Sequence, residues 1–132
     1  MAAMAIVQLR YLDEDNAYRR KLAAIYDSLL IENNNLSIVK APYADECSYH
    51  LYEIVAEKRD ELIDVLCKND IFPGVHYRDN SEYTLYSSQK GKCPNAAYKS
   101  DRLVTLPLHL WLEEDDVRRI ASIVNGFAGT KA

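Results

Sequence analysis

The fold is decided by residues 47–75, CSYHLYEIVAEKRDELIDVLCKNDIFPGV. Residues 47–55 alternate between two faces, which predicts a strand with both faces partly covered. Residues 58–70 place leucine and valine on one side and charges on the other, which is typical of an amphipathic helix. The apolar run 71–75 predicts a second strand. Its Pro73 favours an edge position or a strand end, because proline cannot donate a hydrogen bond to the ladder.

Upstream of this unit, residues 2–31 predict one long helix. They contain no glycine or proline, and their apolar residues recur at helical spacing. The polar run 13–16 indicates that the helix projects into solvent or bends there. Asn33, Asn34 and Asn35 are expected to end it, since asparagine accepts the left-handed backbone of a helix terminus. A helix of this length suggests a strut that packs on something outside the domain.

The rest of the chain supplies shorter elements. We expect a short strand and a loop over 36–46, irregular chain over 78–93, a short helix over 95–103, an extended run over 104–111 and a closing helix over 113–127. Asn125 and Gly126 are expected to stop the closing helix. The order predicts an α+β fold in a single domain, with helices on a small, mainly antiparallel sheet of about three strands.

Composition limits the possible partners and location. The net charge of −4 argues against a nucleic-acid partner, because phosphate binding needs a basic surplus. No apolar run is long enough for a membrane span, and no signal peptide is visible, so a cytoplasmic location is expected. Cys47, Cys67 and Cys93 are odd in number and widely spaced. They form neither a disulfide framework nor a zinc motif, and idle or buried thiols are the simpler interpretation.

No complete catalytic set is visible. The sequence has no GxSxG serine, no phosphate-binding glycine motif, and no second ligand at metal spacing from a histidine. Every lysine lies in a polar setting, unlike a Schiff-base lysine, whose pKa must be lowered. His76 and His109 follow short apolar runs that contain proline, where binding groups often collect. From the residues alone, surface or capping imidazoles are the favoured interpretation of both, and His50 is expected within a strand.

Tyrosine is over-represented, with ten residues against two phenylalanines. A ring with a polar tip suits a pocket wall or a half-buried interface. The cluster GVHYRDNSEY, residues 74–83, places a histidine, two tyrosines and an arginine just after the second predicted strand. The residues alone leave two alternatives open for this cluster, which are a binding loop and partly exposed loop aromatics.

Three segments together resemble a known family. They are QLRYLDEDNAYRRKLAAIYDSLL (8–30), SYHLYEIVAEKRDELIDVLCKNDIFPGVHY (48–77) and CPNAAYKSDRLVTLPLHLWLEEDDVRRIASIV (93–124). In this order they resemble the C-terminal small domain of DegT/StrS-type nucleotide-sugar aminotransferases. These are pyridoxal-phosphate enzymes of aminotransferase fold type I.

The resemblance implies what the intact enzyme would do. An amino group, commonly from glutamate, would pass to a keto group of a nucleotide-linked sugar, for cell-surface polysaccharide or glycan biosynthesis. Pyridoxal phosphate would be the cofactor of an oligomeric enzyme, commonly a dimer. In this family the Schiff-base lysine belongs to the large domain. We therefore expect that residues 2–35 link to an absent large domain, that 36–132 form the small domain, and that this chain alone binds no cofactor and is inactive.

The resemblance also implies substrate-binding residues, and no catalytic ones. His76 and Tyr77 match the family's GVHY motif, and His109 matches LPLH. Arg78 would add a contact to a phosphate, and Tyr83 would line the pocket or stack on a base. These groups are expected to face one shared concavity. The alternatives are a stand-alone module that binds a nucleotide sugar or a protein without catalysis, and a folded but inert remnant. Without the large domain, helix 2–31 would expose its apolar face, so self-association through this helix is expected.

Overall fold

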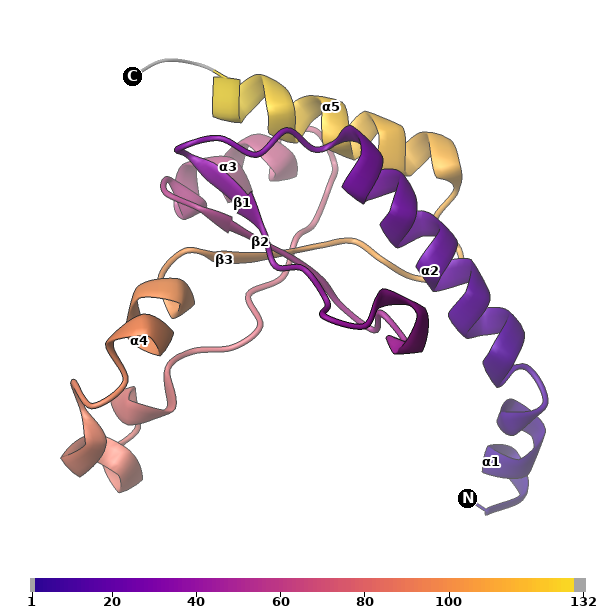
Figure 1. Cartoon of the computed structure of the whole chain (residues 1–132), viewed down its shortest axis with the longest axis horizontal. Helices are drawn as coiled ribbons and strands as arrows, with labels where there is room; N and C mark the ends of the chain where they lie inside the picture. Colours follow the sequence, from indigo (N-terminus) through magenta and orange to yellow (C-terminus); the bar gives the residue numbers. More distant parts are fainter. Residues whose placement is uncertain (1, 130–132) are drawn as a thin grey trace.

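The computed structural model describes residues 2–129 and has an α+β architecture (Figure 1). Its α-helices are α1 (Ala2–Leu9), α2 (Leu12–Leu29), α3 (Arg59–Cys67), α4 (Pro94–Ser100) and α5 (Glu114–Gly129). Its strands are β1 (Leu36–Ile38), β2 (Tyr52–Ala56) and β3 (Leu103–Leu106), and short 3₁₀ helices occupy Ala44–Glu46, Asn80–Glu82 and Thr84–Gln89. The sequence prediction of helices on a small antiparallel sheet of three strands is confirmed.

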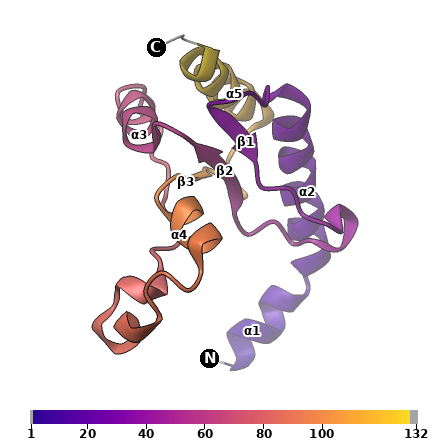
Figure 2. The same cartoon turned by 60° about the vertical axis from the view of Figure 1, so that its left-hand side comes forward.

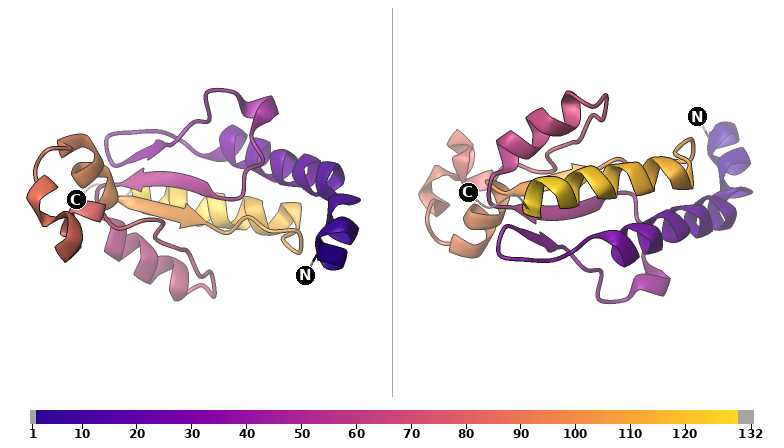
Figure 3. Two further views of the ribbon diagram at one scale, coloured as in Figure 1. Left: turned by 90° about the horizontal axis from the view of Figure 1, so that it is seen from below. Right: turned by 90° about the horizontal axis from the view of Figure 1, so that it is seen from above.

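The sheet has one face covered by helices and one face that is largely open. The strand order is β1-β2-β3 and both pairs are antiparallel, with Ile54 opposite Ile38 on one side and Val104 on the other. Ile54 and Val104 lie in the core with residues of α2, α3 and α5. Seen from below, the strands lie in front of α5 (Figure 3). Glu53 and Thr105, which alternate with these core residues, therefore belong to the opposite face.

The helical side is closed by hydrogen bonds between distant segments. The Tyr26 hydroxyl donates to the Pro107 carbonyl at 3.0 Å, and the Tyr18 hydroxyl donates to the Leu112 carbonyl at 2.8 Å. The Asn125 side chain accepts from the Ile31 N–H at 3.0 Å, and its amide nitrogen donates to the end of α2 at 2.8 Å. The prediction that Asn125 stops the last helix is therefore wrong. Asn125 continues α5 and caps α2 instead, since helix ends leave carbonyls unpaired.

The single helix predicted over 2–31 is interrupted at Arg10 and Tyr11. The N–H groups of these two residues bond to carbonyls three positions back, and α2 then starts at Leu12. The acidic residues Asp13, Glu14 and Asp15 fill the first turn of α2, where the helix dipole favours negative charge. The polar run thus begins a new helix rather than bending an old one.

The two strands predicted around α3 are shorter than expected. Tyr49 has a left-handed backbone with φ of 45°, so β2 begins only at Tyr52, and His50 lies in an exposed bend outside the strand. The run 71–75 forms no strand. Only Gly74 pairs with β3, through two backbone hydrogen bonds of 2.9 and 2.8 Å with Thr105. Pro73 precedes it and cannot donate to the ladder.

The C-terminal predictions need smaller corrections. The extended run predicted over 104–111 gives β3 only as far as Leu106, because Pro107 follows. The short helix predicted over 95–103 is α4, which begins at Pro94, a residue well suited to the first helical position. Residues 78–93, predicted as irregular, hold two of the 3₁₀ helices.

Two projections extend from this body on the side away from α5 (Figures 1 and 2). One is α1. The other is residues 76–100, here called the tyrosine lobe, which contains the last two 3₁₀ helices and α4. At the other edge of the sheet from the lobe, Glu32 makes side-chain contacts that hold β1 in place. Its carboxylate accepts from the Ile38 N–H at 3.0 Å and pairs with Lys40 at 2.8 Å.

Candidate functional site

The base of the candidate site is His76, which lies against β3 where the tyrosine lobe begins. Its Nδ1 is 3.0 Å from the Thr105 hydroxyl, and Thr105 is only 5% exposed. The ring also occupies the space in which a side chain of Gly74 would stand. A Cβ at Gly74 would come within 2.8 Å of Nδ1. The bare glycine backbone therefore lets the imidazole lie close to the sheet.

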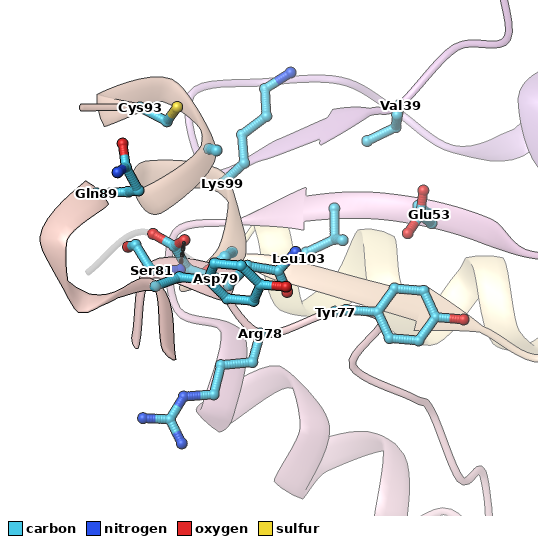
Figure 4. Close-up of a pocket in the computed structure, with 14 residues that line it drawn as sticks. Val39, Glu53, Tyr77, Arg78, Asp79, Ser81, Gln89, Cys93, Lys99 and Leu103 are labelled. Carbon is cyan, nitrogen blue, oxygen red and sulfur yellow. Dashed lines mark hydrogen bonds between the residues drawn. The ribbon is translucent and has the colours of Figure 1, made fainter. Parts of the chain in front are cut away.

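Tyr77 follows His76 and lines a hollow beside the sheet. The two rings meet edge to face, with centroids 5.2 Å apart. The hollow has a volume of about 700 Å³ and lies between the open face of the sheet and the tyrosine lobe. Its lining includes Val39, Glu53, Tyr77, Tyr86, Lys99 and Leu103. Figure 4 shows Lys99 and Tyr77 on different sides of Leu103, and Glu53 on β2 above Tyr77.

Arg78 and Tyr83 form a small cluster at the rim of the hollow. The Arg78 guanidinium lies 5.7 Å from the centre of the Tyr83 ring and 3.8 Å from the Glu82 carboxylate. In Figure 4 the Arg78 side chain points away from the other labelled residues. Its ion pair is long and exposed, so it offers little resistance to a competing anion.

A clamp of three side chains holds α4 against the sheet. The Arg102 guanidinium lies 3.9 Å above the Tyr98 ring and 2.9 Å from the Glu57 carboxylate, and the Tyr98 hydroxyl donates to the same carboxylate. The hydrogen bond to Glu57 raises the pKa of Tyr98, and the bonds from Tyr98 and Arg102 lower the pKa of Glu57. The wall of the hollow formed by α4 is therefore fixed to β2 and β3.

His109 lies apart from the other predicted residues. It lines a separate hollow of about 360 Å³ between the loop after β3 and α5, where its ring is 6.4 Å from that of Trp111. His76 lines a third hollow, of about 240 Å³. The expectation that His76, Tyr77 and His109 face one concavity is therefore wrong, because Pro107 ends β3 before the chain reaches His109. Their roles in substrate binding remain predictions.

The structure adds residues that the sequence reasoning did not select. Thr105 and Gly74 hold His76, and His50 lines the same small hollow although it is distant in sequence. Lys99, interpreted as a solvated charge, is exposed but lines the large hollow and has no ion pair among residues 2–129. Alternation along 103–106 was the available signal for Thr105. No sequence signal pointed to His50.

The lysines do not fit a covalently bound carbonyl cofactor such as pyridoxal phosphate. Every lysine between residues 2 and 129 is exposed. Hydrogen bonds to Glu114, Glu32 and Glu82 raise the pKa of Lys21, Lys40 and Lys90. A Schiff-base lysine needs the opposite shift, which burial provides.

Two further searches of the described part of the chain gave no site. No group of three or more metal-ligating side chains occurs there. No helix there is both long enough and apolar enough to cross a membrane. The three cysteines are free, and Cys67 and Cys93 are exposed.

Comparison with known proteins gives a consistent result. The sequence model of the DegT/DnrJ/EryC1/StrS aminotransferase family matches residues 1–125. The structure of S. venezuelae DesV in complex with a ketimine intermediate superposes with a TM-score of 0.89 at 28% identity, over 99% of this chain and 36% of DesV. The aminotransferase TlmJ from Streptoalloteichus hindustanus gives 0.84 at 26%, over 95% of this chain and 35% of TlmJ.

A more distant structure supports the fold alone. DesI, determined in the presence of its TDP-sugar product, superposes with a TM-score of 0.85 at 19% identity, over 96% of this chain and 34% of DesI. The chain thus spans about a third of the length of each of these proteins. Their structures are those of fold type I aminotransferases, in agreement with the architecture described above.

Proposed function

From the premise that this chain belongs to the DegT/DnrJ/EryC1/StrS aminotransferase family, we propose that it forms the substrate-closing part of a sugar aminotransferase. The whole enzyme transfers an amino group, from glutamate, to a keto group of a nucleotide-linked sugar. The product is an amino sugar for polysaccharide or glycan synthesis. The chain corresponds to a small domain, residues 36–132, with residues 2–35 as its helical link to a cofactor-bearing domain.

One observation supports this role above the others. The helices cover one face of the sheet, while His76, Tyr77 and the hollow of about 700 Å³ lie on the open face. A self-contained domain of this size would be expected to cover both faces or to fill the open one with charge. Here the open face presents rings and a concavity, as a surface that closes over a ligand does.

The cofactor chemistry belongs outside these residues. Because no described lysine is buried, we place the pyridoxal-phosphate lysine in another part of the enzyme and assign no catalytic residue to this chain. Incubation with pyridoxal phosphate, borohydride reduction and mass measurement is expected to give no adduct at a single lysine. A stoichiometric adduct at one lysine would contradict this assignment.

Within this proposal, the predicted residues divide into two groups. Tyr77, Arg78 and Tyr83 stand together near the large hollow, where phenol and guanidinium groups suit the hydroxyls and diphosphate of a nucleotide-linked sugar. His76 lines the small hollow of about 240 Å³ instead, and its ring contacts that of Tyr77. His109 lines the neighbouring hollow and has a more peripheral part in this proposal.

A chimera tests the proposal directly. This chain replaces the matching third of DesV, and cofactor absorbance reports whether the chimera assembles. We expect transamination of a nucleotide-linked keto sugar with glutamate, and a clear loss of turnover when Tyr77→Ala is added. Lys92→Gln, in the same lobe but outside the lining of the large hollow, is the matched control. A chimera that binds the cofactor but never turns over a nucleotide-linked sugar would overturn the proposal.

A second candidate function is a stand-alone module that binds a nucleotide sugar without catalysis. The observation in its favour is that residues from Val39 to Leu103 of this chain already form a hollow of about 700 Å³. Titration of the isolated chain with UDP-glucose, followed by NMR, separates the two candidates. Under the main proposal we expect the isolated chain to bind UDP-glucose more weakly than the DesV chimera does. Equal affinity of the chain and the chimera would favour the module.

A further inference from the structure

We propose that Thr105 and Gly74 are positioning residues that fix His76 so that its Nε2 serves an oxygen of the bound substrate. The substrate oxygen belongs to the diphosphate or a sugar hydroxyl of a nucleotide-linked sugar. This inference rests on the proposed function, in which His76 contacts the substrate. It adds the role of Thr105 and Gly74, which leave Nε2 of His76 as the nitrogen that can contact the substrate.

The first support is the hydrogen bond between His76 and β3. Nδ1 lies 3.0 Å from Thr105 Oγ1, while Nε2 has no hydrogen-bond partner among the described residues. A neutral imidazole has one donor and one acceptor nitrogen, and the partner of one nitrogen decides the state of the other. The Thr105 hydroxyl can donate to Nδ1 or accept from it, and Nε2 is the free nitrogen in both cases. In the proposal the hydroxyl donates, so that the proton is on Nε2 and His76 offers an N–H to an incoming oxygen.

The second support is that Thr105 and Gly74, the two residues that contact the His76 ring, are themselves held in place. Thr105 is nearly buried in β3, and its backbone exchanges both hydrogen bonds with Gly74. The His76 ring lies where a Gly74 side chain would be, so the ring fits closely only because residue 74 is glycine. A buried strand on one side and a bare backbone on the other restrict the ring to one position.

The third support is the hollow that the ring lines. Its volume is about 240 Å³, which is enough for one phosphate or one hydroxyl-bearing group but not for a whole nucleotide. No carboxylate and no lysine or arginine belongs to its lining, whose polar side chains are His50, His76 and Thr105. In a chain of net charge −4, such a place accepts an oxygen-rich group without repulsion from a neighbouring carboxylate.

The test compares Thr105→Val with Thr105→Ser in the full chain. Valine keeps the shape and removes the hydroxyl, whereas serine restores the hydroxyl. Imidazole ¹⁵N shifts report the tautomer of His76, and titration with UDP-glucose reports affinity. We expect T105V to lose the single Nε2–H tautomer and to weaken UDP-glucose binding roughly fivefold, the effect of one net hydrogen bond. We expect T105S to retain both properties.

Gly74→Ala provides a second, independent variant. It leaves the Thr105 hydroxyl in place but pushes the ring away, so the same tautomer and affinity changes are expected. Unchanged amide shifts in β2 and β3 show in each case that the sheet is intact. The inference is overturned if T105V keeps the wild-type tautomer, or if T105S is as defective as T105V. It is also overturned if UDP-glucose shifts the Tyr77 signals but leaves those of His76 unmoved, a result that leaves the proposed function standing.

Discussion

The helical body buries its large apolar side chains, whereas the tyrosine lobe exposes them. In the body, Leu22, Tyr26 and Ile54 are completely buried, and the Tyr26 and Tyr52 rings stack with centroids 4.7 Å apart. In the lobe, Leu85 is 82% exposed and Tyr77 is 70% exposed. No described side chain of the body has a buried polar atom without a hydrogen-bond partner.

The difference separates what makes the chain fold from what makes it bind. Burial of apolar side chains stabilises the body, because each fully buried leucine or isoleucine contributes about 2 kcal/mol. Exposed side chains such as those of the lobe do not stabilise the fold, and they gain burial only when a ligand or another surface covers them. Mutations in the two regions should therefore have effects on different measurements.

The largest effect on folding is expected for Ile54→Ala. The change removes a completely buried side chain in the central strand and leaves a cavity, which costs about 2–5 kcal/mol of unfolding free energy. Leu85→Ala in the lobe should change it by less than about 0.5 kcal/mol. Urea denaturation of both variants measures the contrast. Equal losses would mean that the lobe belongs to the core.

The next effect is expected for Gly74→Ala, at the joint between the two regions. The added methyl group overlaps the His76 ring and should cost about 1–3 kcal/mol. Gly126→Ala is the matched control, because a Cβ there meets nothing within 4 Å and alanine favours α5. We expect G126A to be neutral or stabilising. If G74A is equally benign, the imidazole moves without cost and the joint is loose.

A smaller effect, and one that depends on pH, is expected for Tyr52→Phe. Burial first, and then the 2.7 Å hydrogen bond to Asp27, raise the pKa of Tyr52 above that of an unfolded tyrosine. The neutral ring thus stabilises the fold fully below about pH 10, and this stability is lost as the pH rises further. Phenylalanine should cost about 1 kcal/mol at neutral pH.

The control for this change is the slope of the unfolding free energy against pH in the alkaline range. Between about pH 9 and 11, the unfolding free energy of the wild type should fall more steeply than that of Y52F. A Y52F variant with a wild-type slope would show that the buried phenol does not govern alkaline unfolding.

The smallest effect on folding is expected for the double change Ile6→Glu, Leu9→Glu in α1. Both side chains are at least 60% exposed, so the unfolding free energy should hardly change. Self-association of the isolated chain, measured by light scattering, should decrease, since α1 presents an apolar surface to solvent. A wild-type chain that stays monomeric at high concentration would contradict this expectation.

The elements with strong periodicity were predictable, because burial and pattern agree there. α3 and α5 agree with the helical spacing of Leu62, Leu66, Val117 and Ile120, all of which are buried. Alternation over 47–55 predicted the central strand but not its start at Tyr52. The break at Arg10 was not predictable from periodicity. It coincides with the acidic residues 13–15, which stand in the first turn of α2, where the helix dipole favours them.

The candidate site was only partly predictable, for a different reason. The motif around His76 and Tyr77 predicted binding groups just after the run 71–75, and the structure places His76 beside Thr105 of β3 and Tyr77 in the lining of a hollow. The separation of His109 and the contribution of Thr105 depend on how β3 pairs and where Pro107 ends it. Such long-range pairing is not encoded in local spacing.

The borders of the sheet have a consequence for assembly. Beside β1, the Ile38 N–H is already bonded to Glu32, and the Leu36 N–H is bonded to the Asn33 carbonyl. Beside β3, the Gly74 segment occupies the border and Pro73 offers no donor. These contacts occupy backbone groups that a foreign strand would need, so edge-to-edge pairing is disfavoured at both borders. A partner is therefore expected to meet this molecule mainly through side chains.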